Sequence, residues 1–139
     1  MTVCIDTNVV LGMFGRAGPW VALKDGLIRG ELVWAVSTEI LLEYEEVASR
    51  ELGATAAGQL MRFIELLHQT RGNVQRLAPT FRFLLISPDP DDDKFADCAI
   101  AAGADHLITS DRHFQRMVGS GYRPQPIAPA DFISRYLGS

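Results

Sequence analysis

The sequence feature that most constrains the fold is a repeated alternation of short apolar runs with longer segments of helical periodicity. We expect strands at Thr2–Ile5, Leu32–Val36, Phe83–Ile86, His106–Thr109 and Pro126–Ala128. We expect helices from Pro19 to Gly30, from Ser37 or Thr38 through Val47, and at Ala56–Thr70, Lys94–Ala102, Asp111–Val118 and Pro129–Leu137. Residues 74–82 fit either a short strand or a loop. This alternation indicates βαβ units, so we predict an α/β fold: a three-layer α/β/α arrangement around a mainly parallel central sheet.

The size and composition of the chain are those of one globular domain, which we place at residues 1–139. The residues are 47% hydrophobic and 22% charged, as in ordinary folded proteins. The N-terminal residues do not resemble a signal peptide, and no apolar run approaches the ~20 residues of a membrane span. Cys4 and Cys98 lie in apolar surroundings without a CxxC or CxxH pattern, which favours buried, reduced thiols. We therefore expect a soluble cytoplasmic protein that does not interact with membranes.

The net charge of -4 speaks against a passive nucleic-acid binder, because such proteins are usually basic. It leaves open an enzyme that acts on nucleic acid through metal ions, because bound divalent cations reverse the local sign of the charge. The charge therefore argues against one class of function and does not by itself select among the others.

Acidic residues follow three of the expected strands. Asp6 comes directly after the first strand, and Asp111 follows the strand that ends at Thr109. The cluster Asp89–Asp93 follows residues 83–86. Ligands of open parallel sheets bind outside the carboxyl ends of the strands. These acids are therefore expected to converge at one edge of the sheet.

Glu43 lies about one and a half turns into the second expected helix, where Glu39 and Glu46 can share its face. Taken alone, Glu43 fits a solvated helix acid as well as it fits a site residue. The same holds for each acid at a strand end, since such residues often make turns or cap helices.

Taken together, the acids favour a metal site. Several carboxylates at one edge would raise each other's pKa values, and Asp93 and Asp97, four residues apart on one helix, add about 0.2–0.5 kcal/mol of repulsion. A hard divalent cation removes this penalty, and carboxylates without His or Cys partners suit Mg²⁺ or Mn²⁺ rather than Zn²⁺. The reaction that such a site performs best is in-line phosphoryl transfer to water. Secondary candidates for holding water or phosphate beside the strand ends are Asn8, Thr109 and Ser110.

Four stretches of the chain resemble the motifs of the PIN-domain family. VCIDTNV at Val3–Val9 is similar to the opening strand of PIN domains. STEILLEY at Ser37–Tyr44 is similar to the helix that carries the family's Glu. DKFADCA at Asp93–Ala99 resembles the family's third motif, in which an Asp opens a helix. GADHLITSD at Gly103–Asp111 resembles the fourth motif, a strand that ends in Thr-x-Asp. The resemblance covers about residues 2–137. It is greatest to bacterial and archaeal PIN proteins described as the toxins of toxin–antitoxin pairs.

The resemblance implies a Rossmann-like PIN fold, an acidic pocket for Mg²⁺ or Mn²⁺, and endonucleolytic cleavage of RNA. The residues that match the family's acidic quartet by position are Asp6, Glu43, Asp93 and Asp111. Asp97 is a secondary acidic candidate. The resemblance also implies RNA as the substrate, a cognate antitoxin protein as a partner, and a homodimer.

The four acids are expected to divide the work. Asp6 and Asp93 should be the main metal ligands, because a rigid strand and a helix hold them. Asp111 should support a weaker or second metal site, and Glu43, on a longer side chain, should orient the attacking water.

Two other functions remain open. The first is an Asp-based phosphatase or phosphotransfer domain, although dehalogenase-like enzymes carry Asp-x-Asp where this chain has Asp6-Thr7-Asn8. A receiver domain also needs a Lys after a later strand, which is missing. The second is a non-enzymatic interaction module, in which the acid cluster would bind a basic partner protein.

Overall fold

The computed structural model describes residues 1–14, 18–78, 90–111, 114 and 124–138, and for residues 90–93 it describes the backbone alone. The strands are β1 (Thr2–Ile5), β2 (Val33–Ser37), β3 (Val74–Leu77), β4 (His106–Ile108) and β5 (Pro126–Ile127). The helices are α1 (Thr7–Leu11), α2 (Val21–Ile28), α3 (Thr38–Leu52), α4 (Ala54–Thr70), α5 (Pro90–Ala102) and α6 (Pro129–Tyr136).

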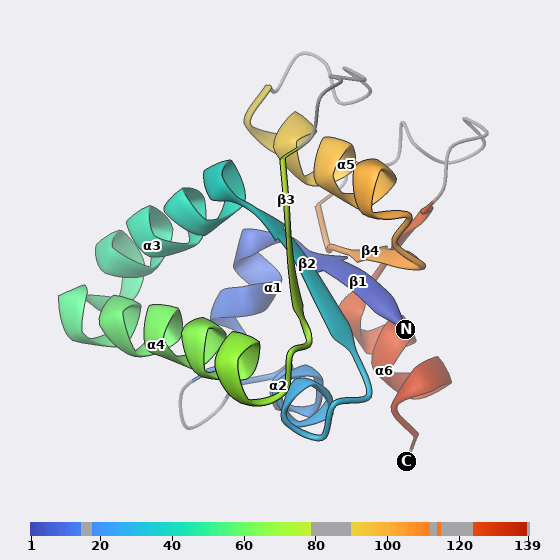
Figure 1. Ribbon diagram of the computed structural model, residues 1–139, viewed down its shortest axis with the longest axis horizontal. Helices are drawn as coiled ribbons and strands as arrows, with labels where there is room; N and C mark the ends of the chain where they lie inside the picture. The colour runs from blue at the N-terminus through green and yellow to red at the C-terminus, as the bar shows by residue number, and fades with distance from the viewer. Residues whose placement is uncertain (15–17, 79–89, 112–113, 115–123, 139) are drawn as a thin grey trace.

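The strands form one sheet in the order β3-β2-β1-β4-β5, and every pair of neighbours is parallel. Helix α5 covers one face of the sheet, while α1, α3 and α4 lie on the other side (Figure 1). The predicted α/β fold with a mainly parallel central sheet is confirmed. The strand order reverses between β1 and β4, and ligands of such sheets bind at the carboxyl ends of the strands at this point.

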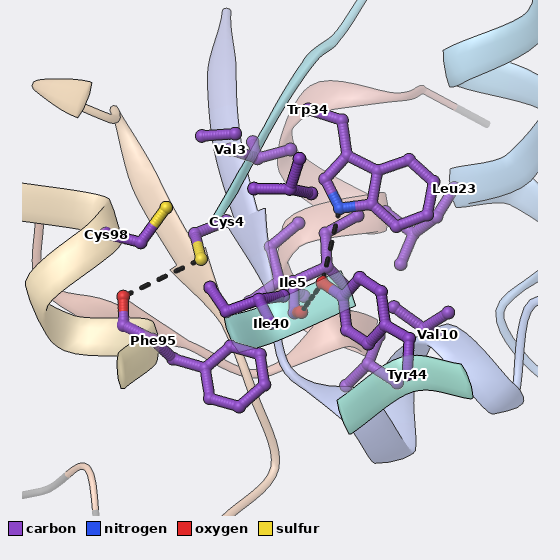
Figure 2. Close-up of a cluster of buried hydrophobic side chains, with 14 of the residues drawn as sticks. Val3, Cys4, Ile5, Val10, Leu23, Trp34, Ile40, Tyr44, Phe95 and Cys98 are labelled. Atoms are coloured by element: carbon purple, nitrogen blue, oxygen red, sulfur yellow. Dashed lines mark hydrogen bonds between the residues drawn. The ribbon is translucent and has the colours of Figure 1, made fainter. Parts of the chain in front are cut away.

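The central strands are buried on both faces, which explains their continuous apolar runs. Cys4 of β1 faces α5 and lies beside Cys98, and both cysteines are free and buried, as predicted. On the opposite face Trp34 of β2 packs against Tyr44 of α3, with ring centroids 5.8 Å apart (Figure 2). The Tyr44 hydroxyl also donates a hydrogen bond to the Ile5 carbonyl oxygen, which fixes the end of β1 and hence the backbone of the next residue, Asp6.

Most expected elements are present with shifted ends. Strand β1 has the predicted bounds, α4 begins two residues before Ala56, and α2 begins at Val21 rather than at Pro19. The ambiguous segment 74–82 contributes β3, which pairs with β2 at the edge of the sheet. The expected strand Phe83–Ile86 lies outside the described residues, as does most of the expected helix Asp111–Val118.

Two details near the sheet edge differ from the expectations. The segment after β1 forms the short helix α1, which was not expected, and Asp6 is its N-cap, accepting a hydrogen bond from the Thr7 N–H at 2.8 Å. Helix α5 begins at Pro90 rather than at Lys94, so Asp93 lies within its first turn instead of opening it. Proline suits the first helical position, and acidic residues are favourable in the first turn because of the helix dipole. The helix therefore starts within the acidic cluster rather than after it.

The longest described helix, α4, has 17 residues and is amphipathic. One side of it is buried against the core through Ala57, Leu60, Ile64 and Leu67. Within the described ranges, no helix combines the length and the apolar character needed to cross a bilayer.

Candidate active site

Asp6 lies at the carboxyl end of β1, where the strand order reverses, and only 5% of its surface is exposed. Its Oδ1 accepts a hydrogen bond from the Thr7 N–H, and its Oδ2 accepts one from the Thr109 hydroxyl at 2.9 Å. Its own N–H donates to the Ile108 carbonyl oxygen at 3.0 Å. The Asp6 carboxylate is therefore held in one orientation by β1, α1 and the end of β4.

The electrostatic environment of Asp6 disfavours its ionised form. Burial raises the pKa of Asp6 from 3.8 to about 6, although the hydrogen bonds from Thr109 and Thr7 act in the opposite direction. The negative charges of Asp111 and Glu43 raise this pKa further. A cation bound beside Asp6 would remove this penalty, because it would neutralise the carboxylates that repel one another.

Thr109 links Asp6 to Asp111. The Thr109 hydroxyl, which donates to Asp6, also accepts a hydrogen bond from the Asp111 N–H at 3.0 Å. The structure thus brings together Asp6, Thr109 and Asp111, as expected from their places after two neighbouring parallel strands. Ser110, between the last two, is exposed at the same edge.

Glu43 reaches this region from α3. Ser37 caps that helix, its hydroxyl oxygen accepting a hydrogen bond from the Ile40 N–H at 3.2 Å, and Ile40 and Tyr44 are buried. Glu43 Oε2 accepts a hydrogen bond from the Thr7 hydroxyl, and Glu43 Oε1 forms an ion pair with Lys94 Nζ at 2.7 Å. Glu43 is therefore bonded to side chains from α1 and α5 and is not a solvated helix acid.

A groove of about 490 Å³ runs alongside these groups on α3. It is lined by Thr7, Asn8, Glu39, Leu42, Glu43, Glu46, Val47, Arg50 and Lys94. Asn8 is exposed in it, as are Glu39 and Glu46, which share a helix face with Glu43 as the sequence predicted. The groove is open and mostly polar, so it can admit a charged ligand to the Glu43 carboxylate.

The remaining predicted acids lie on α5, whose first turn starts at the carboxyl edge of the sheet, near the start of α3 (Figure 1). Asp97 is buried, with 3% of its surface exposed. Asp93 lies one turn earlier on the same helix, but its side chain is outside the described residues. Its sequence neighbour Lys94 contacts Glu43, so the backbone of Asp93 lies close to the groove.

The donor chemistry fits a hard cation. Among the side chains that the structure describes, no three Asp, Glu, His or Cys residues form a group able to hold a metal by themselves. Asp6 and Asp111 nevertheless supply carboxylate oxygens on one strand edge, and burial of the Asp6 carboxylate, with a smaller effect from the charges of Asp111 and Glu43, raises the pKa of Asp6. Oxygen ligands of this kind suit Mg²⁺ or Mn²⁺, which keep several waters in their coordination.

Comparison with known proteins decides the family. The sequence model of the PIN domain matches residues 2–113. The chain belongs to the PIN-domain family. No curated protein sequence matches it.

Two solved structures have the same fold as this PIN domain. VapBC-1 from nontypeable Haemophilus influenzae is 20% identical, with a TM-score of 0.60 over 94% of this chain and 99% of the other. VapBC2 from Rickettsia felis, bound to a DNA fragment from their promoter, is 16% identical, with a TM-score of 0.55 over 84% of this chain and 92% of the other. At these identities the likeness shows a shared fold alone.

Sequence reasoning missed two polar side chains of this PIN domain, Thr7 and Lys94. Each stands directly after a candidate acid, Thr7 after Asp6 and Lys94 after Asp93. Lys94 is also the only basic residue between positions 89 and 97. That isolated positive charge was the available signal, but the sequence does not tell which carboxylate it meets.

Proposed function

We propose that this PIN domain is a metal-dependent endoribonuclease that hydrolyses phosphodiester bonds of RNA with Mg²⁺ or Mn²⁺ as its cofactor. One observation carries the proposal. The buried carboxylate of Asp6, with its pKa raised to about 6, lies at the point where the strand order reverses and is tied through Thr109 to Asp111. Carboxylates held together against their mutual repulsion favour a divalent cation, and such sites serve phosphoryl transfer.

We assign the metal to Asp6, Asp93 and Asp111. When bound, the metal supplies positive charge for the scissile phosphate and lowers the pKa of water. Asp6 is well fixed, because hydrogen bonds engage both of its oxygens. Thr109 positions Asp6 and the backbone of Asp111 with a single hydroxyl group.

Glu43 has a different role from the three aspartates. Its carboxylate borders the groove and is held by Thr7 and Lys94, so it can accept a hydrogen bond from the attacking water and orient it toward phosphorus. Asn8 and Ser110 are exposed at the same edge and are the polar groups available to a phosphate oxygen.

The biological setting follows from the resemblance. We propose that the protein is the toxin of a toxin–antitoxin pair, is bound by a cognate antitoxin protein, forms a homodimer and acts in the cytoplasm. The sequence motifs and the similarity to two VapBC structures support a toxin with an antitoxin partner.

The test is RNA cleavage by protein purified from a host without an antitoxin. Excess EDTA should abolish cleavage, and added Mg²⁺ or Mn²⁺ should restore it. Asp6→Asn should be inactive, while Glu45→Gln, which changes an exposed α3 carboxylate outside the groove, should cut like the wild type. Full activity in excess chelator would overturn the metal-dependent mechanism. A folded, metal-loaded protein that leaves all RNA intact would favour the non-enzymatic alternative.

A further inference from the structure

The ion pair between Lys94 and Glu43 is partly buried, unlike two others among the described residues. Its side chains are 15% and 20% exposed, whereas those of the ion pairs Arg29–Glu31 and Arg50–Glu51 are each about half exposed. A buried ion pair adds little stability, since desolvation of both charges offsets their attraction. The Lys94–Glu43 pair therefore calls for a reason other than stability.

Both carboxylate oxygens of Glu43 are occupied within the protein. Oε2 accepts a hydrogen bond from the Thr7 hydroxyl, and Oε1 faces the Lys94 ammonium. Glu43 is also near enough to Asp6 for its charge to raise the pKa of that residue. Each oxygen keeps a further lone pair that can accept a hydrogen bond from water. A metal ion coordinated by Glu43 would, in contrast, have to share the carboxylate with the positively charged Lys94 ammonium, which repels it.

We propose that Lys94 is a positioning residue that keeps Glu43 out of direct metal coordination and aims its carboxylate at the attacking water. This inference rests on the proposed function. Lys94 acts from the first two turns of α5, directly after Asp93, so α5 would supply both a metal ligand and the group that holds Glu43 apart from the metal. Without the ammonium, Glu43 is free to move to the metal.

Removal of Lys94 should therefore tighten metal binding while slowing catalysis. In Lys94→Met, which keeps an apolar stem of similar length, we expect Mn²⁺ to bind about tenfold more tightly in calorimetric titration without RNA. The value of kcat should fall by about tenfold or more, because Glu43 no longer orients the water. Lys94→Arg, which keeps the positive charge, should have a Mn²⁺ affinity and a kcat closer to those of the wild type. A purely structural ion pair would leave Mn²⁺ affinity unchanged or weaker.

A double variant distinguishes movement of Glu43 to the metal from simple repulsion between Lys94 and the metal. Loss of any positive charge near the site tightens cation binding, so Lys94→Met is repeated with Glu43→Gln. We expect most of the gain in Mn²⁺ affinity to disappear in that background, because the neutral amide is a poor ligand and only the effect of the lost charge remains. If the full gain persists there, Lys94 only repels the metal and the proposal is wrong.

The matched control is Lys24→Met. Lys24 is the only other lysine in the chain, and its ammonium lies 5.0 Å from the centroid of the Phe14 ring, outside the groove. Its removal should leave Mn²⁺ affinity unchanged; a tenfold gain there too would overturn the proposal. Thermal unfolding in metal-free buffer shows that each variant is folded, and Lys94→Gln replaces Lys94→Met if the latter does not fold. Since Mn²⁺ titration needs no RNA, a wild type that binds Mn²⁺ but cuts no RNA refutes the proposed function and leaves the ranking of affinities measurable.

Discussion

The Thr109 hydroxyl donates a hydrogen bond to Asp6 Oδ2 at 2.9 Å and thereby joins the ends of β4 and β1, 103 residues apart in the sequence. Parallel pairing of Ile5 with Ile108 places the two residues side by side after their strands. The same hydroxyl oxygen accepts the Asp111 N–H, so one small side chain organises two of the predicted metal ligands. Both Asp6 and Thr109 are buried, which makes this bond sensitive to substitution.

We expect Thr109→Val, which replaces the hydroxyl by a methyl group of similar size, to destabilise the metal-free protein at pH 7. An ionised Asp6 loses a charge-assisted hydrogen bond, and the free energy of unfolding should fall by about 1–3 kcal/mol. Urea denaturation measures the loss. Thr109→Ser, which keeps the hydroxyl, should retain most of the stability, and Thr55→Val on the exposed side of α4 should have little effect. Equal losses in the valine and serine variants would show that the methyl group matters and not the hydrogen bond.

The raised pKa of Asp6 predicts how stability depends on pH. Its folded pKa of about 6 lies above the unfolded value of 3.8, so the folded state binds more protons between these values. The contribution of Asp6 is therefore complete below pH 3.8 and is lost as the pH rises through 6, by about 3 kcal/mol at most. Asp6→Asn removes this loss, so the metal-free variant should unfold at a higher temperature than the wild type at pH 7.5.

Unfolding of both proteins from pH 5 to 7.5, with and without Mn²⁺, checks this prediction. Mn²⁺ should raise the melting temperature of the wild type and have little effect on Asp6→Asn, since an amide binds the metal poorly. A metal-free variant that melts well below the wild type at pH 7.5 would instead indicate that Asp6 serves mainly to cap α1.

The sequence was sufficient for the features that follow from periodicity and topology. Asp6, Thr109 and Asp111 could be placed together because residues that follow neighbouring parallel strands meet at one edge. Helix α1 was missed because its five residues are too few to show a helical period and overlap the turn-like Asp6-Thr7-Asn8. The contact between Lys94 and Glu43 could not be predicted, since it depends on how α5 packs beside α3 and on the choice of side-chain rotamer.

We expect Tyr44→Phe to loosen the end of β1. The buried Tyr44 hydroxyl donates to the Ile5 carbonyl oxygen and accepts a hydrogen bond from Trp34 Nε1 at 3.4 Å. Its removal leaves buried polar groups without a partner and should lower the free energy of unfolding by about 1–3 kcal/mol. Chemical denaturation measures this loss, and Tyr136→Phe, at a side chain that is 41% exposed, serves as the control. Similar stability of wild type and Tyr44→Phe would mean that these hydrogen bonds contribute no net stability.

The last prediction concerns how the acids share the reaction. Asp6→Asn and Asp93→Asn should each abolish cleavage, leave the fold intact and weaken Mn²⁺ binding most. Asp111→Asn should raise the metal concentration needed for half-maximal activity, because we expect Asp111 to support a second or weaker metal site. Glu43→Gln should lower kcat with little effect on Mn²⁺ affinity, because Thr7 and Lys94 already engage both oxygens of the Glu43 carboxylate.

Calorimetric titration of Mn²⁺ into each variant, paired with cleavage rates across metal concentrations, tests this ranking. The two measurements separate the roles, since loss of a metal ligand can be offset by more metal whereas loss of the group that orients the water cannot. Saturating Mn²⁺ should therefore rescue Asp111→Asn toward the wild-type rate and leave Glu43→Gln slow. If Glu43→Gln loses Mn²⁺ as completely as Asp6→Asn, Glu43 is a direct ligand. The bound metal would then share the Glu43 carboxylate with Lys94.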